Sequence, residues 1–175
     1  MYVYNCVIGR KSAMENTITF EIVKTPEQKR EFKDMLRQVA NELIARNMPL
    51  WDEEDLSDQA LFSEGQAYIC RVEGKPAGTF ILCDGDGLFW PHITDGKSLF
   101  VHKVSVGKGF NGMGVSHKML EFARQEALRR HKEYMRLDCR SERVKLRAVY
   151  EGFGFSFVGL TYLIDKTCAK YEIRL

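Results

Sequence analysis

The order of hydrophobic and polar positions predicts a chain that alternates between strands and helices. Residues 17–23 alternate and are rich in β-branched side chains, which is typical of a strand. Residues 25–28 carry the signals of a helix start: a threonine that can cap, a proline at the first helical position and a glutamine that can complete a capping box. Apolar residues then recur at i, i+3 and i+4 as far as Ile44, which predicts a long amphipathic helix that ends near residues 47–49.

The same patterns predict a mixed sheet with helices on both of its faces. The later elements are expected in this order: a short helix within 49–62, a hairpin over 66–87 turning at 73–75, a strand at 98–106, a helix at 111–131, a strand at 134–139, a helix within 141–155 that ends at Gly154, and closing strands at 155–164 and 171–175. The order β-α-α-β-β-β-α-β-α-β-β predicts the α+β class, as a mixed α/β sandwich. The chain of 175 residues is expected to form a single domain over 16–175, with 1–15 as an N-terminal appendage.

Composition and charge exclude several classes of protein. The net charge of +2 is too small to favour nucleic acid or a membrane surface as a partner. No apolar run approaches the roughly 18 residues of a membrane span, and the first basic residues follow the first apolar residues, unlike a secretory signal. The five cysteines are at least 13 residues apart, which argues against both a zinc site and a disulfide framework and favours a reducing, cytoplasmic location; they are Cys6, Cys70, Cys83, Cys139 and Cys168.

Four glycines separate the strand expected at 98–106 from the helix that follows it. Such glycines let a phosphate approach the free N–H groups of a helix start, but they also suit a plain tight turn, and their spacing leaves both readings open. A Walker A loop would need a lysine after Gly114, where the chain has Val115. The letters GxGxxG run from Gly107 to Gly112, but they come late in the chain rather than in a first βαβ unit.

Two segments together resemble the GNAT superfamily of N-acetyltransferases. Residues 111–116 resemble that family's acyl-coenzyme-A-binding motif, [R/Q]-x-x-G-x-[G/A], although Asn111 replaces the usual arginine or glutamine and Ser116 the usual glycine or alanine. The segment AVYEGFGF, residues 148–155, is similar to a second motif of the family, with its tyrosine, glycine and final phenylalanine in place. The two motifs have the family's separation and order of elements, and the resemblance covers about residues 17–175.

The resemblance implies transfer of an acetyl group from acetyl-CoA to a primary amine of a small molecule or peptide, by direct attack in a ternary complex and without a metal. It implies a largely antiparallel sheet that is splayed between its fourth and fifth strands, where the pantetheine arm lies. The implied coenzyme-binding residues are Val104, Ser105 and Val106 for the pantetheine, and Asn111, Gly112, Met113, Gly114, Val115, Ser116 and His117 for the pyrophosphate. Arg143 replaces an asparagine common in the family and is a further candidate for the coenzyme phosphates, with solvation of the helix surface as the alternative.

The resemblance also implies two catalytic residues. Tyr150 matches the tyrosine often assigned as the general acid for the departing thiolate; packing within an apolar helix stripe is the alternative. His102 lies four residues before Val106, where some members carry a glutamate base, and strand alternation places it on the same face as Val104. Imidazole titrates near neutrality, as a base for an ammonium should. A structural histidine and a water relay remain as alternatives.

The implied acceptor pocket contributes Trp51, Trp90 and Tyr162, whose aromatic faces can hold a cationic amine. The neighbouring acidic residues 52–54 either favour such a cation or form a solvated loop. Two other functions stay open: a non-catalytic acyl-CoA-binding module on the same fold, and an unrelated phosphate-binding α/β protein. A homodimer through an edge strand or the N-terminal tail is also left open.

Overall fold

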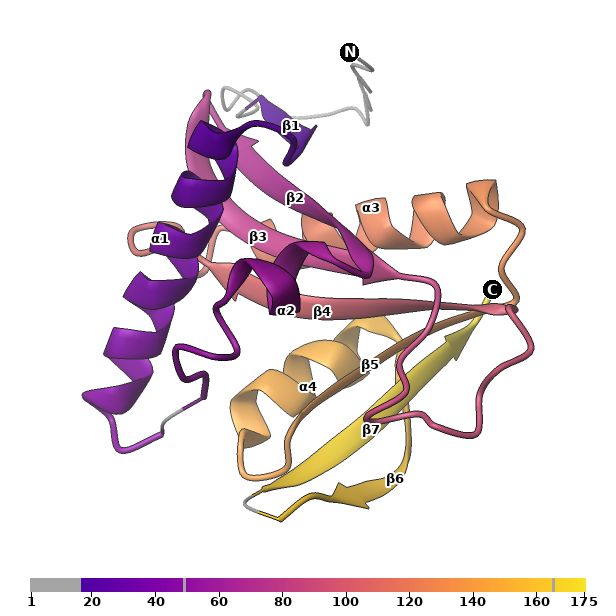
Figure 1. Cartoon of the computed structure of the whole chain (residues 1–175). Helices are drawn as coiled ribbons and strands as arrows, with labels where there is room; N and C mark the ends of the chain where they lie inside the picture. Colours follow the sequence, from indigo (N-terminus) through magenta and orange to yellow (C-terminus); the bar gives the residue numbers. More distant parts are fainter. Residues whose placement is uncertain (1–16, 49, 165) are drawn as a thin grey trace.

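A single sheet of seven strands forms the centre of the molecule, in a computed structural model that describes residues 17–48, 50–164 and 166–175. The strands are β1 (Ile18–Ile22), β2 (Gly65–Val72), β3 (Lys75–Cys83), β4 (Ser98–Val106), β5 (Tyr134–Arg140), β6 (Ser156–Tyr162) and β7 (Thr167–Arg174). The helices are α1 (Pro26–Ile44), α2 (Asp58–Phe62), α3 (Val115–Arg129) and α4 (Val144–Phe153). The predicted class and element order are confirmed (Figure 1). The appendage expected at 1–15 lies outside the described residues.

The helix boundaries follow from local chemistry. The N–H of Gln28 donates to Thr25 Oγ1 at 3.3 Å and the N–H of Thr25 donates to Gln28 Oε1 at 2.9 Å, so the predicted capping box opens α1. Helix α3 begins at Val115, later than the start expected near residue 111, because Gly112 and Gly114 have φ values of 79° and 75°. These left-handed conformations belong to turns and favour glycine.

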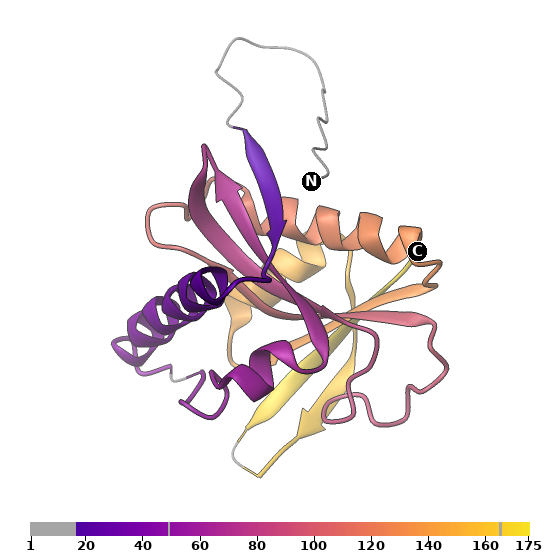
Figure 2. The same ribbon diagram turned by 45° about the horizontal axis from the view of Figure 1, so that its top comes forward.

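The two faces of the sheet are covered by different helices. Helices α1 and α2 bury Phe32, Leu36 and Leu61 against one face. Helices α3 and α4 cover the other face, where Met119 and Tyr150 belong to the larger core cluster. Figure 2 shows the two helix layers on opposite sides of the sheet. None of the helices in the described part of the chain is long and apolar enough to cross a membrane.

The strand order is β1-β2-β3-β4-β5-β7-β6, and every neighbouring pair is antiparallel except β4 and β5. That parallel pair is short: it joins Ser98 to Tyr134, Leu99 to Met135 and Phe100 to Arg136. Strand β4 nevertheless continues to Val106 and β5 to Arg140, so the two strands diverge beyond these pairs. This divergence confirms the splay expected between the fourth and fifth strands.

A bulge in β4 changes which side chains share a face. The pairing of β3 with β4 shifts register between Thr79 and Ile81, and Lys103 has a φ of 53°. After the bulge, Val104 and Val106 pack on the same core as Val101 before it. Simple alternation placed His102 on the face of Val104, and this prediction is wrong because the extra residue reverses the alternation.

Candidate active site

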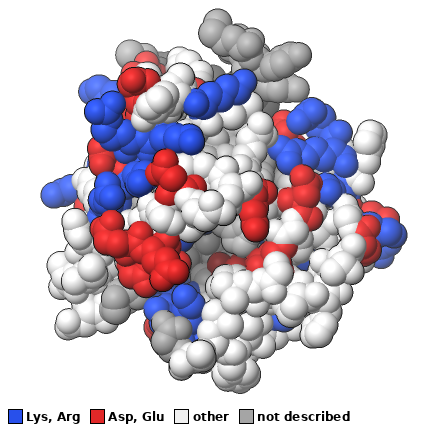
Figure 3. All heavy atoms as spheres, in the orientation of Figure 1, with Lys and Arg blue, Asp and Glu red and all other residues white. Residues whose placement is uncertain are grey.

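Two hollows in the described surface differ in chemistry. One, of about 410 Å³, lies along α1 and is lined by Lys24, Pro26, Lys29, Arg30, Lys33, Arg37 and Asp58. Basic side chains gather over this side of the molecule in Figure 3. The other, of about 150 Å³, lies where β4 and β5 diverge, and histidine, tyrosine, lysine and aspartate side chains line it. The second hollow has the groups that acid–base chemistry needs, and it is called the gap cavity below.

The gap cavity collects side chains from segments far apart in the sequence. Its walls are formed by β4 (Val101, His102, Lys103, Val104), β5 (Asp138, Cys139, Arg140), the start and body of α4 (Arg143, Leu146, Tyr150), the loop before α2 (Leu50, Trp51, Asp55), the loop after β3 (Leu88, Phe89) and the start of the last hairpin strand (Lys166, Cys168). It therefore brings together the two catalytic candidates, His102 and Tyr150.

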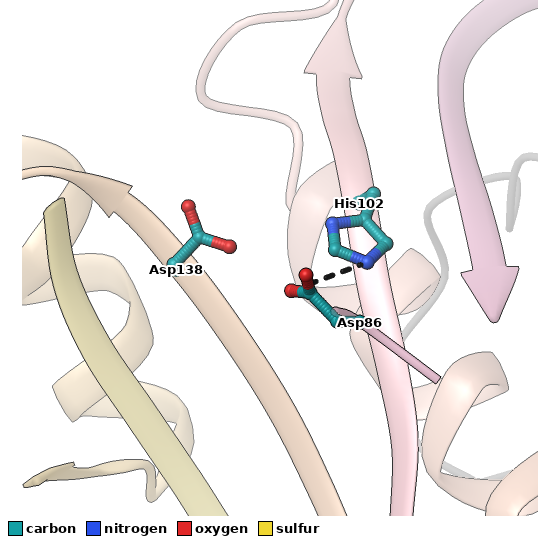
Figure 4. A group of neighbouring side chains, drawn as sticks. All are labelled: Asp86, His102 and Asp138. Carbon is teal, nitrogen blue, oxygen red and sulfur yellow. Dashed lines mark ion pairs between the residues drawn. The ribbon is translucent and has the colours of Figure 1, made fainter. Parts of the chain in front are cut away.

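His102 and Asp138 line the gap cavity and form a group with Asp86, which lies beside His102 but does not line the cavity. Asp86 Oδ1 accepts hydrogen bonds from the N–H groups of Leu88 (3.1 Å) and Phe89 (2.9 Å), which fix the carboxylate. Its other oxygen, Oδ2, is buried, has no hydrogen-bond partner among the described residues, and lies 3.8 Å from His102 Nε2. Figure 4 shows Asp138, on β5, directed toward the same space. Sequence reasoning missed both carboxylates; the signal for Asp138 was an acidic residue inside a predicted strand.

The spacing of this group indicates what it can hold. One nitrogen of His102 and one oxygen of each carboxylate lie within 4.8 Å of one another. Ligands of a tetrahedral zinc ion, each at about 2.1 Å, stand about 3.4 Å apart. Acceptors around an ammonium nitrogen, each at about 2.8 Å, stand about 4.6 Å apart. His102 Nε2 and Asp86 Oδ2 are 3.8 Å apart, between these two spacings, so the distances alone do not distinguish an ammonium from a metal ion.

Burial sets the proton affinities of the group. It raises the pKa of Asp138 to about 7, with the Asp86 charge adding to the rise and Lys166, Lys103 and Lys170 opposing it. Burial lowers the pKa of His102 below its ordinary value; the Asp86 carboxylate opposes this, and Lys103 adds to it. The imidazole is therefore neutral at pH 7 and able to accept a proton.

Tyr150 lies inside the fold with one side toward the gap cavity. Its side chain is buried, and its ring packs against Phe155 and Tyr171 with centroids 5.9 and 6.0 Å apart. Burial raises the pKa of the phenol well above its ordinary value. The phenol thus keeps its proton at neutral pH, as a proton donor must.

The glycine turn presents the first turn of α3 to solvent. Gly114 is the N-cap residue, and no side chain caps the helix. A Cβ at Gly112 or Gly114 would meet no protein atom within 4 Å, so open space lies beside both. The first N–H groups of a helix have no partner within it and attract anions. Asn111, Met113 and His117 are exposed around this turn, and Ser116 is half-buried. This arrangement can accept a phosphate.

Some of the other predicted site residues line the gap cavity, and others lie outside it. Trp51, Val104 and Arg143 line the gap cavity. Ser105 is buried on β4, and its hydroxyl has no hydrogen-bond partner within the described chain. Trp90 and Tyr162 do not line the cavity: Trp90 is buried beside Phe100 and the cations Arg136 and Lys170, and Tyr162 is 74% exposed at the end of β6.

The described cysteines fit the prediction of inert thiols. Cys70, Cys83, Cys139 and Cys168 are free, and all but Cys83 are buried. Burial raises the pKa of Cys70 and of Cys139 to about 12, so neither is a thiolate near neutral pH. Cys6 lies outside the described residues.

We expect Asp138→Asn to stabilise the protein at alkaline pH. The folded-state pKa of about 7 lies above the ordinary aspartate pKa of 3.8, so the folded state holds the proton more tightly than the unfolded state. Wild-type stability therefore falls as pH rises from about 4 to 7, and the full penalty remains above pH 7. We compare the melting temperatures of Asp138→Asn and wild type at each pH. The gain in melting temperature from the substitution should be at least about 5 °C larger at pH 8 than at pH 4.5. Asp34→Asn, at a carboxylate with 64% of its side chain exposed, is the control; a pH-independent difference for Asp138→Asn would contradict the prediction.

Comparison with known proteins identifies the family of the chain. The model of the acetyltransferase (GNAT) family matches residues 36–155. A curated relative, the uncharacterized N-acetyltransferase YesJ of Bacillus subtilis (strain 168), is 23% identical over 100 residues, which cover 55% of this chain and 56% of the relative. The chain thus spans little more than half the length of the curated relative it matches.

Solved structures share the whole architecture. A GNAT-family acetyltransferase from Listeria monocytogenes 4b F2365 superposes with a TM-score of 0.73 and 20% identity, covering 95% of this chain and 100% of that one. The aminoglycoside acetyltransferase AAC(6')-Ib, in complex with coenzyme A and kanamycin, has a TM-score of 0.70 and 16% identity, covering 90% of this chain and 94% of that one. These likenesses establish the fold. Because the family model spans the glycine turn, the diverging strands and Tyr150, the chain belongs to the acetyltransferase (GNAT) family of acyltransferases.

Proposed function

We propose that the protein transfers an acetyl group from acetyl-CoA to a primary amine of a small molecule or peptide, by direct attack in a ternary complex. The observation that carries this proposal is that His102, Asp138 and Tyr150 line one cavity where β4 and β5 diverge, with the Asp86 carboxylate 3.8 Å from His102 Nε2. Family membership and the neighbours solved with acetyl-CoA or coenzyme A support acetyl-CoA as the cosubstrate.

The diverging strands and the glycine turn provide places for the two ends of the coenzyme. In this proposal the pantetheine arm lies beside Val104, Ser105 and Val106, where β4 has separated from β5. The pyrophosphate lies on the N–H groups of the segment from Gly112 to His117, with Asn111 beside it. Arg143, which lines the gap cavity, lies nearer the thioester end of this path than its first assignment to the phosphates implied.

The acceptor must lose a proton before it can attack. In this proposal Asp138, which lines the cavity, accepts a hydrogen bond from the ammonium, and neutral His102 accepts one of its protons at Nε2. The Asp86 carboxylate, 3.8 Å from that nitrogen, then stabilises the imidazolium. The free amine attacks the thioester carbonyl, and a backbone N–H of β4 near Val104 donates to the developing oxyanion.

Collapse of the tetrahedral intermediate breaks the carbon–sulfur bond. Tyr150 donates its phenolic proton to the departing thiolate, and the second proton lost by the attacking nitrogen returns to the phenolate through water. His102 releases the first proton to solvent, and the products are the amide and free coenzyme A. A water relay instead of His102 would leave the role of Tyr150 unchanged.

The size of the gap cavity limits which part of the acceptor enters. A cavity of about 150 Å³ is roughly 5 Å across. This width suits an aminomethyl end of the acceptor but not a whole sugar or peptide. Trp51 lines this space and offers an aromatic face to a cation. The kanamycin complex of the aminoglycoside acetyltransferase shows that this fold can serve polycationic acceptors, which supports an acceptor with an accessible primary amine.

A thiol-release assay with acetyl-CoA and a panel of amines tests the function. We expect turnover with primary amines, none with matched tertiary amines, and initial-rate patterns of a ternary complex. Thermal shift with acetyl-CoA, ATP and NAD accompanies it, because a ligand of the native state raises stability. Binding of coenzyme A without turnover on any amine would favour a non-catalytic acyl-CoA-binding module. A thermal shift with ATP or NAD alone would exclude both the acetyltransferase and the acyl-CoA-binding module.

We expect His102→Ala to lower kcat by about 100-fold or more at neutral pH. The wild-type rate falls as pH drops through the lowered pKa of His102, because a protonated imidazole accepts no proton. The variant loses this acid limb, and its rate instead rises with pH as the amine itself deprotonates. The measurement is kcat against pH at saturating amine, with His92→Ala, at an exposed loop residue, as control. A variant profile identical to that of wild type would assign the proton to water or another group.

A further inference from the structure

Lys103 occupies an unusual place in β4. It is the residue at the bulge, its φ of 53° is rare for a side chain with a Cβ, and only 15% of its side chain is exposed. Its Nζ lies 4.9 Å over the ring of Trp51 and 3.9 Å from Asp55 Oδ1. The chain therefore supplies an ammonium of its own to an aromatic face and a carboxylate at the wall of the gap cavity.

The same lysine is partly neutral at mildly alkaline pH. Burial lowers its pKa to about 8, and Lys166 adds to this, while Asp55, Asp52 and Asp138 oppose it. These groups face Lys103 from the loop before α2, from β5 and from the turn before β7; His102, Arg140 and Arg143 also line the cavity. An ordinary surface lysine, with a pKa near 10.4, has far less of the nucleophilic free amine at pH 8.

Position adds to this reactivity. Lys103, His102 and Tyr150 line one cavity of about 150 Å³, so the side chain of Lys103 borders the space where the proposed thioester carbonyl enters. No hydrogen bond holds the amine to these two groups: the cation–π contact with Trp51 is 4.9 Å long, and the 3.9 Å pair with Asp55 is longer than a hydrogen bond. The amine can leave Trp51 by rotation of its own side chain.

We propose that Lys103 is a self-acetylation site, modified by acetyl-CoA in the gap cavity when no acceptor amine is bound. Its Nζ forms a bond to the acetyl carbonyl carbon and the carbon–sulfur bond breaks. The amine proton passes to His102, and the thiolate takes its proton from Tyr150. The product is Nε-acetyllysine, a neutral amide that passes the acetyl group no further, so one event removes the cation beside Trp51 and Asp55. This inference rests on the proposed acetyl transfer.

The test uses the full chain with acetyl-CoA labelled in its acetyl group, at pH 8 and without acceptor, followed by peptide mass spectrometry. We expect label on Lys103 to approach one acetyl group per chain, at least about tenfold faster than on Lys97, whose side chain is 52% exposed. The rate per chain should not depend on protein concentration. It should fall when a primary amine that the enzyme acetylates is added.

Two controls separate self-acetylation from chemical acetylation. In urea-denatured chain the preference for Lys103 over Lys97 should disappear, because the cavity is lost. In Gly114→Val, which lacks the coenzyme cradle, Lys103 should be labelled no faster than Lys97. Wild-type peptides carry the primary evidence, so the test does not depend on whether a Lys103 variant folds.

The possible failures are distinguishable. If amines are acetylated but Lys103 is labelled no faster than Lys97, self-acetylation is overturned and the proposed function stands. If the chain neither binds acetyl-CoA nor acetylates any amine, both proposals fall. If Lys103 is labelled equally fast in the presence of saturating acceptor, the label does not arise in the acceptor site. Self-acetylation of Lys103 in the gap cavity is then overturned.

Discussion

Gly114→Val abolishes measurable binding of acetyl-CoA while the sheet stays folded: this is the largest effect that we expect from a single substitution. Gly114 has a φ of 75°, which a β-branched residue adopts only with strain. Relief of that strain turns the first N–H groups of α3 away from the phosphate position, and the valine side chain fills the open space beside them. The affinity should fall by at least about 100-fold, equivalent to about 2.7 kcal/mol. Calorimetric titration with acetyl-CoA measures it, and far-UV circular dichroism confirms the fold.

The chain offers a matched control for backbone strain. Gly74, in the turn between β2 and β3, has a φ of 74°, and a Cβ there would also meet no atom within 4 Å. It does not line the gap cavity. Gly74→Val should therefore lose similar stability and keep the wild-type affinity for acetyl-CoA. Equal affinity in Gly114→Val and wild type would show that the coenzyme lies elsewhere.

The second large effect is expected for Tyr150→Phe. The substitution removes the phenolic oxygen and keeps the packing of the ring against Phe155 and Tyr171. We expect kcat to fall about 100-fold, the typical contribution of a general acid, with little change in the affinity for coenzyme A. Steady-state kinetics give kcat, and titration with coenzyme A gives the affinity.

Tyr171→Phe is the control for loss of a buried hydroxyl. The Tyr171 hydroxyl accepts a hydrogen bond from Arg147 Nε (2.8 Å) and donates one to Glu151 Oε1 (2.7 Å), and Tyr171 does not line the gap cavity. This variant should lose about 1 kcal/mol of stability and little turnover. If Tyr150→Phe turned over at the wild-type rate, the phenol would be only a packing residue.

The features that could be predicted from the sequence are those that neighbouring residues determine. Thr25 and Gln28 form a capping box through bonds between residues three apart, and the apolar run of β4 marks its bounds without reference to any other strand. The glycine turn that we assign to the coenzyme could be singled out because its glycines stand close together and resemble a family motif. Each of these signals lies within a few residues of the chain.

The features that escaped prediction depend on contacts between distant segments. The bulge at Lys103 arises from the pairing of β4 with β3, so residue alternation alone gave the wrong face for His102. Asp86 and Asp138 are 52 positions apart (138 − 86), and only the fold brings both to the imidazole. Trp90 is of a residue type that suits an acceptor pocket, but its loop directs the ring into the interior, beside Phe100.

The divergence of β4 from β5 gives the sheet an edge in its own interior. Edge strands invite pairing by other chains, and proteins commonly guard them with charged side chains and bulges. Here the interior edge has both, since the bulge falls at Lys103 and the charged side chains that line the opening include Lys103 and Arg140. Charged groups at the gap cavity therefore also protect the sheet against strand addition by another chain. Replacing several of them together with apolar residues would make the empty enzyme prone to aggregate.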